Sequence, residues 1–191
     1  MGLLKKDAQP FTYADYCQWP QDERFELIDG VAHAMGPAPV RRHQVFAGEI
    51  FRQIANALKG KPCQPFIAPF DVRLPKADRA DDKTDTVVQP DISVVCDKAK
   101  LDERGCMGAP DWVIEVVSPA TASHDHILKR QVYERSGVQE YWIVHPVDRM
   151  VTVYWLIDGA YQRPDVYELT STLASLAVPA AVIDWNELPT D

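Results

Sequence analysis

Apolar residues along this chain follow two spacings, and each spacing predicts a different kind of element. Between residues 42 and 59 the apolar side chains recur every four positions, at Phe46, Ile50, Ile54 and Leu58. This period predicts an amphipathic helix with one face turned toward a core. Residues 87–95 and 112–117 are instead nearly continuous apolar runs rich in Val and Ile, which predict buried strands.

Turn and cap signals add two elements near the start of the chain. Asp29 and Gly30 interrupt the apolar-rich stretch 24–35, a pattern typical of a tight β-hairpin. Thr12 followed by Asp15 resembles a helix capping box with Asp in place of Glu, and it predicts a short helix in front of the hairpin.

The later segments complete the predicted fold. We expect strands at 66–74, 140–146 and 150–157, and a helix that begins at Thr121 or Ser123 and ends near 135. This order predicts an α/β fold, in which a mixed β-sheet is flanked by helices and preceded by a hairpin. The helix between 112–117 and 141–144 implies that these two strands are parallel, with the first near the sheet centre.

Length and composition are those of one ordinary globular domain. The 191 residues, 46% hydrophobic and 25% charged, suffice for a single domain over 1–191, with its core at about 11–161. No apolar run approaches the roughly eighteen residues of a membrane span, and the first residues lack a signal-peptide pattern. We therefore expect a soluble, cytoplasmic protein without membrane contacts.

The cysteines and the net charge limit the remaining possibilities. Cys17, Cys63, Cys96 and Cys106 show neither a CxxC spacing nor a zinc pattern, so we expect free, buried thiols. The 20 basic residues are outnumbered by 28 acidic ones. This balance counts against tight, nonspecific nucleic-acid binding by the monomer, but it leaves room for a local basic groove.

Two carboxylates interrupt the apolar strands and carry the candidate chemistry. Asp91 lies within 87–95 and Glu115 within 112–117. A carboxylate among Val and Ile has to be paired, hydrogen-bonded or bound to a cation, because desolvation otherwise favours its neutral form. Oxygen ligands suit Mg²⁺ or Mn²⁺, and no Cys and His cluster offers the ligands that zinc prefers. These residues therefore predict a divalent-metal site.

Two further residues are candidates for catalytic roles. Lys129 lies about two turns into the helix that follows Glu115, and its long side chain can lean back toward the strand end. There it could position or activate an attacking water. Glu26, on the predicted hairpin, could be a further ligand or an orienting group.

The strand residues also have simpler interpretations. Asp91 follows Pro90 and could accept hydrogen bonds from turn amides. Glu115 could form a buried ion pair with an arginine such as Arg73. Tyr133 is better suited to core packing than to substrate contact.

The helix and hairpin candidates have alternatives of the same kind. Asp125 stands four residues before Lys129, so an i,i+4 pair on a solvated helix face would account for both. Glu26 beside Arg24 could form a surface pair. His43, near the start of the long helix, is more typical of a capping or packing residue than of a catalytic one.

Taken together, these residues resemble the Uma-type restriction endonuclease family, which belongs to the PD-(D/E)XK nuclease superfamily. The motifs that carry the resemblance are Phe25-Glu26-Leu27-Ile28-Asp29-Gly30, His43 in the long helix, Gln89-Pro90-Asp91-Ile92, residues 113–119, Lys129 with Tyr133, and residues 137–142. Each motif alone is weak, whereas their order and spacing together are specific.

The resemblance implies a restriction endonuclease-like fold and a set of roles. Asp91 matches the Asp of the PD motif, and Glu115 matches the acid of the second motif. The implied metal ligands are Asp91, Glu115 and Val116. The lysine expected two positions after the acid is absent, because Val117 stands there, and the resemblance moves this role to Lys129 in the following helix.

Two more positions bear on the resemblance. Glu26 matches the hairpin acid of the family pattern. Where relatives often carry Val-Asp-Pro after the Tyr-Trp strand, this chain has Val144-His145-Pro146, so any role of that Asp is lost or altered.

Residues and resemblance lead to one preferred function and one alternative. The preferred function is a Mg²⁺-dependent endonuclease acting on DNA, with Asp91 and Glu115 binding the metal, Lys129 activating water and Glu26 assisting. The alternative is a non-catalytic binding or assembly protein that retains the nuclease fold, and the acidic composition favours it slightly.

A homodimer is a further expectation. Cutting both DNA strands calls for two sites related by a two-fold axis. The candidate interface residues are aromatic side chains that could equally belong to the core, namely Tyr141, Trp142, Tyr154 and Trp155.

Overall fold

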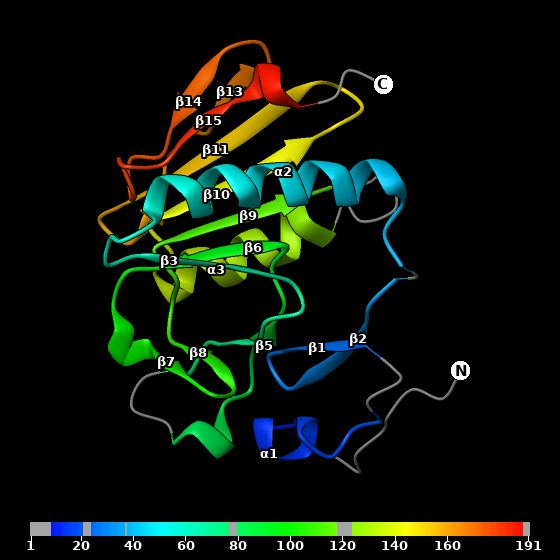
Figure 1. Ribbon diagram of the computed structural model, residues 1–191. Helices are drawn as coiled ribbons and strands as arrows, with labels where there is room; N and C mark the ends of the chain where they lie inside the picture. The colour runs from blue at the N-terminus through cyan, green and yellow to red at the C-terminus, as the bar shows by residue number, and fades with distance from the viewer. Residues whose placement is uncertain (1–8, 21–23, 37, 77–79, 118–123, 189–191) are drawn as a thin grey trace.

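The computed structural model describes residues 9–20, 24–36, 38–76, 80–117 and 124–188, except the side chains of 124–126 (Figure 1). Its α-helices are α1 (Tyr13–Tyr16), α2 (Arg41–Leu58) and α3 (Arg130–Ser136). The strands of the first half are β1 (Phe25–Ile28), β2 (Val31–Ala34), β3 (Gln64–Ile67), β4 (Val72–Arg73), β5 (Val87–Val88) and β6 (Ile92–Val95). Those of the second half are β7 (Leu101–Asp102), β8 (Gly105–Met107), β9 (Trp112–Val116), β10 (Glu140–His145), β11 (Met150–Ile157), β12 (Ala160–Tyr161), β13 (Asp165–Glu168), β14 (Thr172–Ala174) and β15 (Val182–Asp184).

A mixed, seven-stranded sheet forms the centre of the fold. Its order is β12-β11-β10-β9-β6-β3, with β13 paired to β11. β9 lies between β10 and β6, and it runs parallel to β10, with Ile143 opposite Glu115. The predicted α/β class, the mixed sheet and the central, parallel position of residues 112–117 are therefore confirmed.

A second sheet holds the N-terminal hairpin. Its order is β2-β1-β5-β4-β8-β7, and it lies with α1 at the opposite end of the molecule from β13–β15 (Figure 1). Asp29 and Gly30 connect β1 to β2 with positive φ values of 52° and 75°, the backbone conformation that tight hairpin turns demand. In α1, the Asp15 carboxylate accepts hydrogen bonds from both the N–H and the hydroxyl of Thr12. The predicted hairpin and short capped helix are both present.

The two faces of the seven-stranded sheet pack against different elements. On β9, Trp112, Ile114 and Val116 pack with the buried side of α2, whereas Val113 packs with α3 and with the second sheet. The helix predicted from the four-residue spacing is α2, and it buries Phe46, Ile50, Ile54 and Leu58. Because side chains alternate along a strand, Glu115 falls on the α3 face, between the two sheets.

Two predicted strands are wrong in extent, because each is divided between the two sheets. The predicted strand 66–74 is broken around Pro69 into β3 and β4. The predicted strand 87–95 is broken at residues 89–91 into β5 and β6. Proline cannot donate a ladder hydrogen bond, so Pro69 and Pro90 mark the points where the chain leaves one sheet for the other. The hairpin formed by β7 and β8 was not predicted from the sequence.

The helix before β10 differs from its prediction in form. Residues His124–Lys129 adopt a π-helical turn that continues into α3. Gly137 ends α3 in the left-handed conformation, with φ 88°, as glycine at a helix C-terminus often does. The predicted caps Thr121 and Ser123 lie outside the described residues.

The prediction of free, buried cysteines holds in full only for Cys106. Cys63 and Cys96 form a disulfide, because the β3–β6 register places Gln64 opposite Val95 and hence these two cysteines at the same end of the pair. Cys106 is a free, buried thiol as expected, whereas Cys17 is free and exposed. The cytoplasmic location stays a prediction. Within the described residues, no helix has the length and apolar character needed to cross a membrane.

Candidate active site

The crossing from β5 to β6 places Asp91 beside Glu115. The Val116 N–H donates to Asp91 Oδ2 at 2.8 Å, and the Asp91 N–H faces Glu115 Oε2 at 3.3 Å. Ile92 lies opposite Ile114 in the sheet, so the two carboxylates come from adjacent positions on paired strands. The Asp91 side chain is 20% exposed, whereas Glu115 is 3% exposed. Asp91 is therefore the point where this pair reaches solvent.

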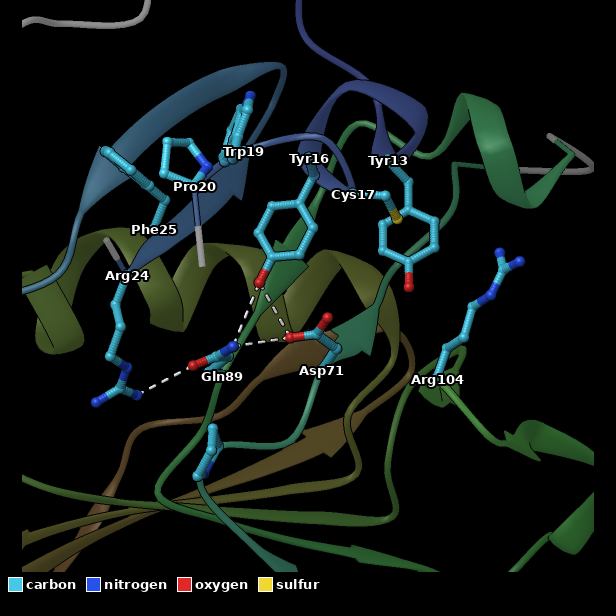
Figure 2. A pocket seen from close by; sticks show the side chains of 11 residues that line it. Tyr13, Tyr16, Cys17, Trp19, Pro20, Arg24, Phe25, Asp71, Gln89 and Arg104 are labelled. Atoms are coloured by element: carbon cyan, nitrogen blue, oxygen red, sulfur yellow. Dashed lines mark hydrogen bonds between the residues drawn. The ribbon is translucent and has the colours of Figure 1, made fainter. Parts of the chain in front are cut away.

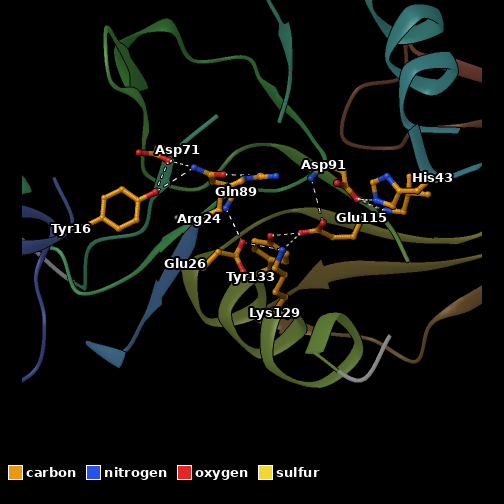
Figure 3. Close-up of polar contacts among 11 residues, drawn as sticks. Tyr16, Arg24, Glu26, His43, Asp71, Gln89, Asp91, Glu115, Lys129 and Tyr133 are labelled. Atoms are coloured by element: carbon orange, nitrogen blue, oxygen red, sulfur yellow. Dashed lines mark hydrogen bonds and ion pairs between the residues drawn. The ribbon is translucent and has the colours of Figure 1, made fainter. Parts of the chain in front are cut away.

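Glu115 is held by two side chains from the helical segment behind the sheet. Lys129 Nζ donates to Glu115 Oε1 at 2.9 Å, and the Tyr133 hydroxyl donates to the same oxygen at 2.8 Å (Figure 3). Residues 129 and 133 stand four positions apart, the spacing that brings side chains to one side of a helix. A hydrogen-bonded buried cation offsets the large desolvation cost of a buried carboxylate.

Lys129 also bridges to the N-terminal hairpin. Its Nζ lies 3.0 Å from Glu26 Oε1, and Glu26 and Lys129 are 3% and 4% exposed. The same Glu26 oxygen accepts the backbone N–H of Gln89 at 2.8 Å. One buried ammonium group is therefore shared between two carboxylates that come from different sheets.

His43 approaches the pair from the opposite side, on the first turn of α2. Its Nε2 lies 3.0 Å from Asp91 Oδ2, and its side chain is 13% exposed. Its Nδ1 is buried, with no hydrogen-bond partner among the described residues. His43 therefore orients Asp91 through Nε2.

The polar contacts continue from Glu26 toward α1. The Gln89 side chain donates through Nε2 to Asp71 Oδ1 at 2.8 Å, and its Oε1 accepts from Arg24 at 3.0 Å. The Tyr16 hydroxyl donates to Asp71 Oδ1 at 3.0 Å. Burial and the neighbouring Asp71 charge raise the pKa of Tyr16 well above its usual value, so the phenol stays a donor. Figure 3 shows these residues in one line with the carboxylates.

The donor set suits a hard divalent cation. Asp91 and Glu115 supply carboxylate oxygens, and Val116, with an apolar side chain, offers only its backbone carbonyl. Among the described residues, no three His, Cys, Asp or Glu side chains form a complete metal cage. Mg²⁺ needs no such cage, since it commonly binds one or two carboxylates and completes its shell with waters and substrate phosphate. The residues therefore fit Mg²⁺ or Mn²⁺ better than zinc.

The simpler interpretations of Glu115, Lys129 and Glu26 do not describe their contacts. Arg73 is fully buried, but it pairs with Asp81 and Asp102, each at 2.7 Å, and not with Glu115. Lys129 points into the structure toward Glu115, and the side chain of Asp125 lies outside the described residues. Glu26 is buried against Lys129 instead of lying on the surface.

The comparisons with known proteins can now be set beside this geometry. Residues 13–186 match the Uma2 family, described as "Putative restriction endonuclease". The chain belongs to this family. The match covers the hairpin, both carboxylate strands and the helix that carries Lys129.

One relative supports the family assignment, and one solved structure supports the fold. An uncharacterized protein of Synechocystis sp. (strain PCC 6803) is 30% identical over 174 residues, which cover 86% of this chain and 87% of that protein. A crystal structure from Anabaena variabilis, described as a putative nuclease belonging to DUF820, superimposes with a TM-score of 0.69. It is 22% identical and covers 90% of this chain and 92% of that one. The restriction endonuclease-like fold expected of an Uma2 member is thereby confirmed.

The structure also shows what reasoning from sequence missed. Asp91, Glu115, Lys129 and Glu26 were selected from sequence, and the Uma2 fold brings all four together. Tyr133 packs in the core as predicted, and its hydroxyl also bonds to Glu115. His43, interpreted as a capping or packing residue, bonds to Asp91. Gln89 stands in the motif, but its side-chain role had no sequence signal, because Asp71 and Arg24 are distant in the chain.

Proposed function

We propose that this Uma2 protein is a Mg²⁺-dependent endonuclease that hydrolyses phosphodiester bonds in DNA. One observation carries the proposal: Lys129 and Tyr133 converge on one oxygen of Glu115, while its other oxygen lies beside Asp91. A partly exposed carboxylate, a buried carboxylate and an ammonium group within hydrogen-bond distance of the latter form a charge arrangement that suits phosphoryl chemistry.

Each residue then has a defined task. Asp91 and Glu115 would hold the ion through carboxylate oxygens, and Val116 through its backbone carbonyl. When bound, Mg²⁺ polarises the phosphodiester and lowers the pKa of a coordinated water. Lys129 would position the attacking water and stabilise the negative charge that develops on phosphate oxygens. Glu26 and Tyr133 fix Lys129 and Glu115 in place, and His43 orients Asp91.

The oligomeric state follows from the same proposal. Double-strand cleavage calls for two copies related by a two-fold axis, so a homodimer is expected. Tyr141 and Trp142 are fully buried in this chain, so they contribute to the core and not to an interface. Sedimentation of the purified protein, with and without DNA, tests the expectation.

Cleavage of plasmid, duplex and single-stranded DNA in Mg²⁺ tests the activity directly. We expect Asp91→Asn to reduce cleavage by about 10³-fold or more while circular dichroism stays unchanged. Full activity of Asp91→Asn would refute the assignment. A wild-type protein that cleaves none of these substrates would favour the non-catalytic binding protein, which the formal net charge of -8 also favours.

A further inference from the structure

A cavity of about 610 Å³ lies beside the carboxylates, between α1, the start of β1 and the chain before β6. We call it the aromatic cavity, and its defining lining residues are Tyr16, Trp19, Arg24, Phe25, Asp71 and Gln89 (Figure 2). Its volume is in the range of about 300–1,000 Å³ that small-molecule sites occupy. Neither the metal carboxylates nor Lys129 line it, so the proposed hydrolysis does not account for it.

One wall of the aromatic cavity is a cluster of rings. The Trp19 ring centroid lies 5.2 Å from that of Tyr16 and 5.3 Å from that of Phe25. All three side chains are half-buried and line the cavity. Tyr16 and Trp19 pack on one side against a small core that contains Tyr13, while the same rings also border the cavity. Aromatic side chains that line an open cavity provide surfaces on which nucleobases stack.

The polar side of the cavity has a fixed orientation. Asp71 Oδ1 accepts from both Tyr16 and Gln89, while Arg24 holds the other end of the Gln89 amide. Asp71 Oδ2 has no hydrogen bond from any described residue, and Figure 2 shows it turned toward the space between Tyr16 and Tyr13. A carboxylate oxygen in this position accepts from an amino group, such as N4 of cytosine.

Two arginines border the same space. Arg24 and Arg104 both line the cavity, and both are exposed. Arg104 lies 3.8 Å from Asp81, a long pair that leaves most of its donors to solvent. On a protein with a formal net charge of -8, two exposed guanidinium groups beside an aromatic wall provide local phosphate contacts.

The cavity is connected to the candidate active site by two short stretches of chain. Gln89 lines the cavity and stands two residues before Asp91, so their Cα atoms are at most about 7 Å apart. Phe25 lines the cavity and Glu26, the next residue, pairs with Lys129. A strand whose phosphate lies at Asp91 therefore brings a nearby nucleotide to the cavity, since stacked nucleotides rise about 3.4 Å each along a strand.

We propose that the aromatic cavity binds one unpaired nucleobase of the substrate strand and prefers bases with an exocyclic amino group. The base stacks on the wall formed by Trp19, Tyr16 and Phe25, its amino group donates to Asp71, and Arg24 and Arg104 contact the flanking phosphates. This inference deepens the proposed nuclease function and rests on it for the choice of ligand.

Cys17 provides a readout that does not depend on activity. It lines the cavity and is exposed, whereas Cys106 is buried and the other two cysteines are paired. The alkylation rate of Cys17 by iodoacetamide, followed by mass spectrometry in EDTA, reports cavity occupancy. The probes are single-stranded octanucleotides of dC or dT, and an abasic octanucleotide with the same number of phosphates, each checked for integrity afterwards.

We expect the dC probe at about ten times its Kd to slow alkylation about tenfold, and the abasic probe to protect far less. The dT probe, which lacks an amino group, should bind about 5- to 100-fold more weakly than dC. Equal protection by the dC and abasic probes, or no protection by either, would overturn the proposal. Equal protection by dC and dT would overturn its amino-group preference.

Variants localise the effect. Trp19→Leu should weaken dC binding about 5- to 100-fold, because one stacking surface is lost. Arg24→Gln, at an exposed position, is a second cavity variant in case Trp19→Leu disturbs α1. It should weaken the binding of all three probes. The matched control is Tyr167→Ala, which removes an exposed aromatic residue on β13, and it should change nothing. Unchanged binding in both cavity variants would contradict the proposal.

The two proposals fail separately. Base-dependent protection of Cys17 without DNA cleavage in Mg²⁺ would keep the nucleobase site and remove the nuclease assignment. DNA cleavage in Mg²⁺ without base-dependent protection of Cys17 would keep the nuclease assignment and remove the nucleobase site.

Discussion

Glu115 and Glu140 are two buried glutamates on neighbouring parallel strands with different surroundings. Glu140 is fully buried, and its carboxylate accepts from Ser175 Oγ, the Ala177 N–H and the Trp142 indole N–H. All of these donors are neutral, and burial raises the pKa of Glu140 to about 7 despite them. Glu140 therefore anchors the segment after β14 to the start of β10.

Glu115 has a cation as a partner and a second carboxylate as a neighbour. Lys129 donates to it, and Asp91 beside it is 20% exposed on the side chain. The comparison teaches that burial of a carboxylate does not mark a candidate site by itself. Glu115 has a buried cationic partner and a neighbouring acid that reaches solvent, and Glu140 has neither. These two features distinguish a candidate reactive site from a carboxylate that only anchors the structure.

The largest expected difference between the two glutamates is in cleavage. Glu115→Gln should lower DNA cleavage in Mg²⁺ by about 10³-fold or more, because a metal ligand is lost. Glu140→Gln should leave the cleavage rate nearly unchanged, because its contacts lie on the other side of the sheet. Equal losses in the two variants would show that the effect is structural.

Replacement of the shared ammonium group has the next largest effect. Lys129→Met should reduce cleavage by about 10²- to 10³-fold, which lies within the range for a positioned proton-handling group. It should also lower the free energy of unfolding by about 3 kcal/mol, because Glu115 and Glu26 then lie buried without their cation. Activity assays and urea unfolding measure the two effects.

The double variant Glu26→Gln/Lys129→Met tests whether Lys129 bridges the two carboxylates. With Glu26→Gln already present, Lys129→Met should destabilise less than it does alone, because one buried carboxylate is gone. Strict additivity of the two unfolding free energies would contradict the bridge between the sheets.

The raised pKa of Glu140 predicts a pH dependence of stability. The folded-state pKa of about 7 exceeds the ordinary value of 4.5, so this stabilisation is complete below about pH 4.5. It is lost as pH rises through 7, because the unfolded chain ionises first. The loss is about 3 kcal/mol, measured by urea unfolding between these pH values. A Glu140→Gln variant with the same pH slope as wild type would contradict the assignment.

The smallest expected effect is that of the residue orienting Asp91. His43→Ala should lower cleavage by about 10- to 100-fold, as loss of a ligand-orienting partner commonly does, with little change in stability. An unchanged rate would show that Val116 alone fixes Asp91. The matched control is Arg52→Ala on the same helix, whose exposed side chain pairs with Glu49 in α2 and with Glu187 near the C-terminus.

Sequence predicted the elements that depend on local pattern. The apolar period of α2, the Asp29-Gly30 turn and the strand at 112–117 each express a preference of neighbouring residues. Carboxylates inside apolar strands identified Asp91 and Glu115, because such positions are costly unless the charge is compensated.

Sequence failed where distant segments decide the outcome. The division of 87–95 between two sheets depends on pairing of β5 with β1 and of β6 with β9. The disulfide of Cys63 with Cys96 depends on the β3–β6 register. The aromatic cavity joins α1, Asp71 and Gln89, which no local pattern connects.

The most direct test of the central claim is calorimetric titration of Mn²⁺ into three proteins, wild type, Glu115→Gln and Glu140→Gln, with and without a short DNA oligonucleotide that supplies phosphate ligands. The account predicts saturable binding by wild type and by Glu140→Gln, and its loss in Glu115→Gln. Equal binding by Glu115→Gln and wild type, or no binding by wild type under either condition, would contradict it.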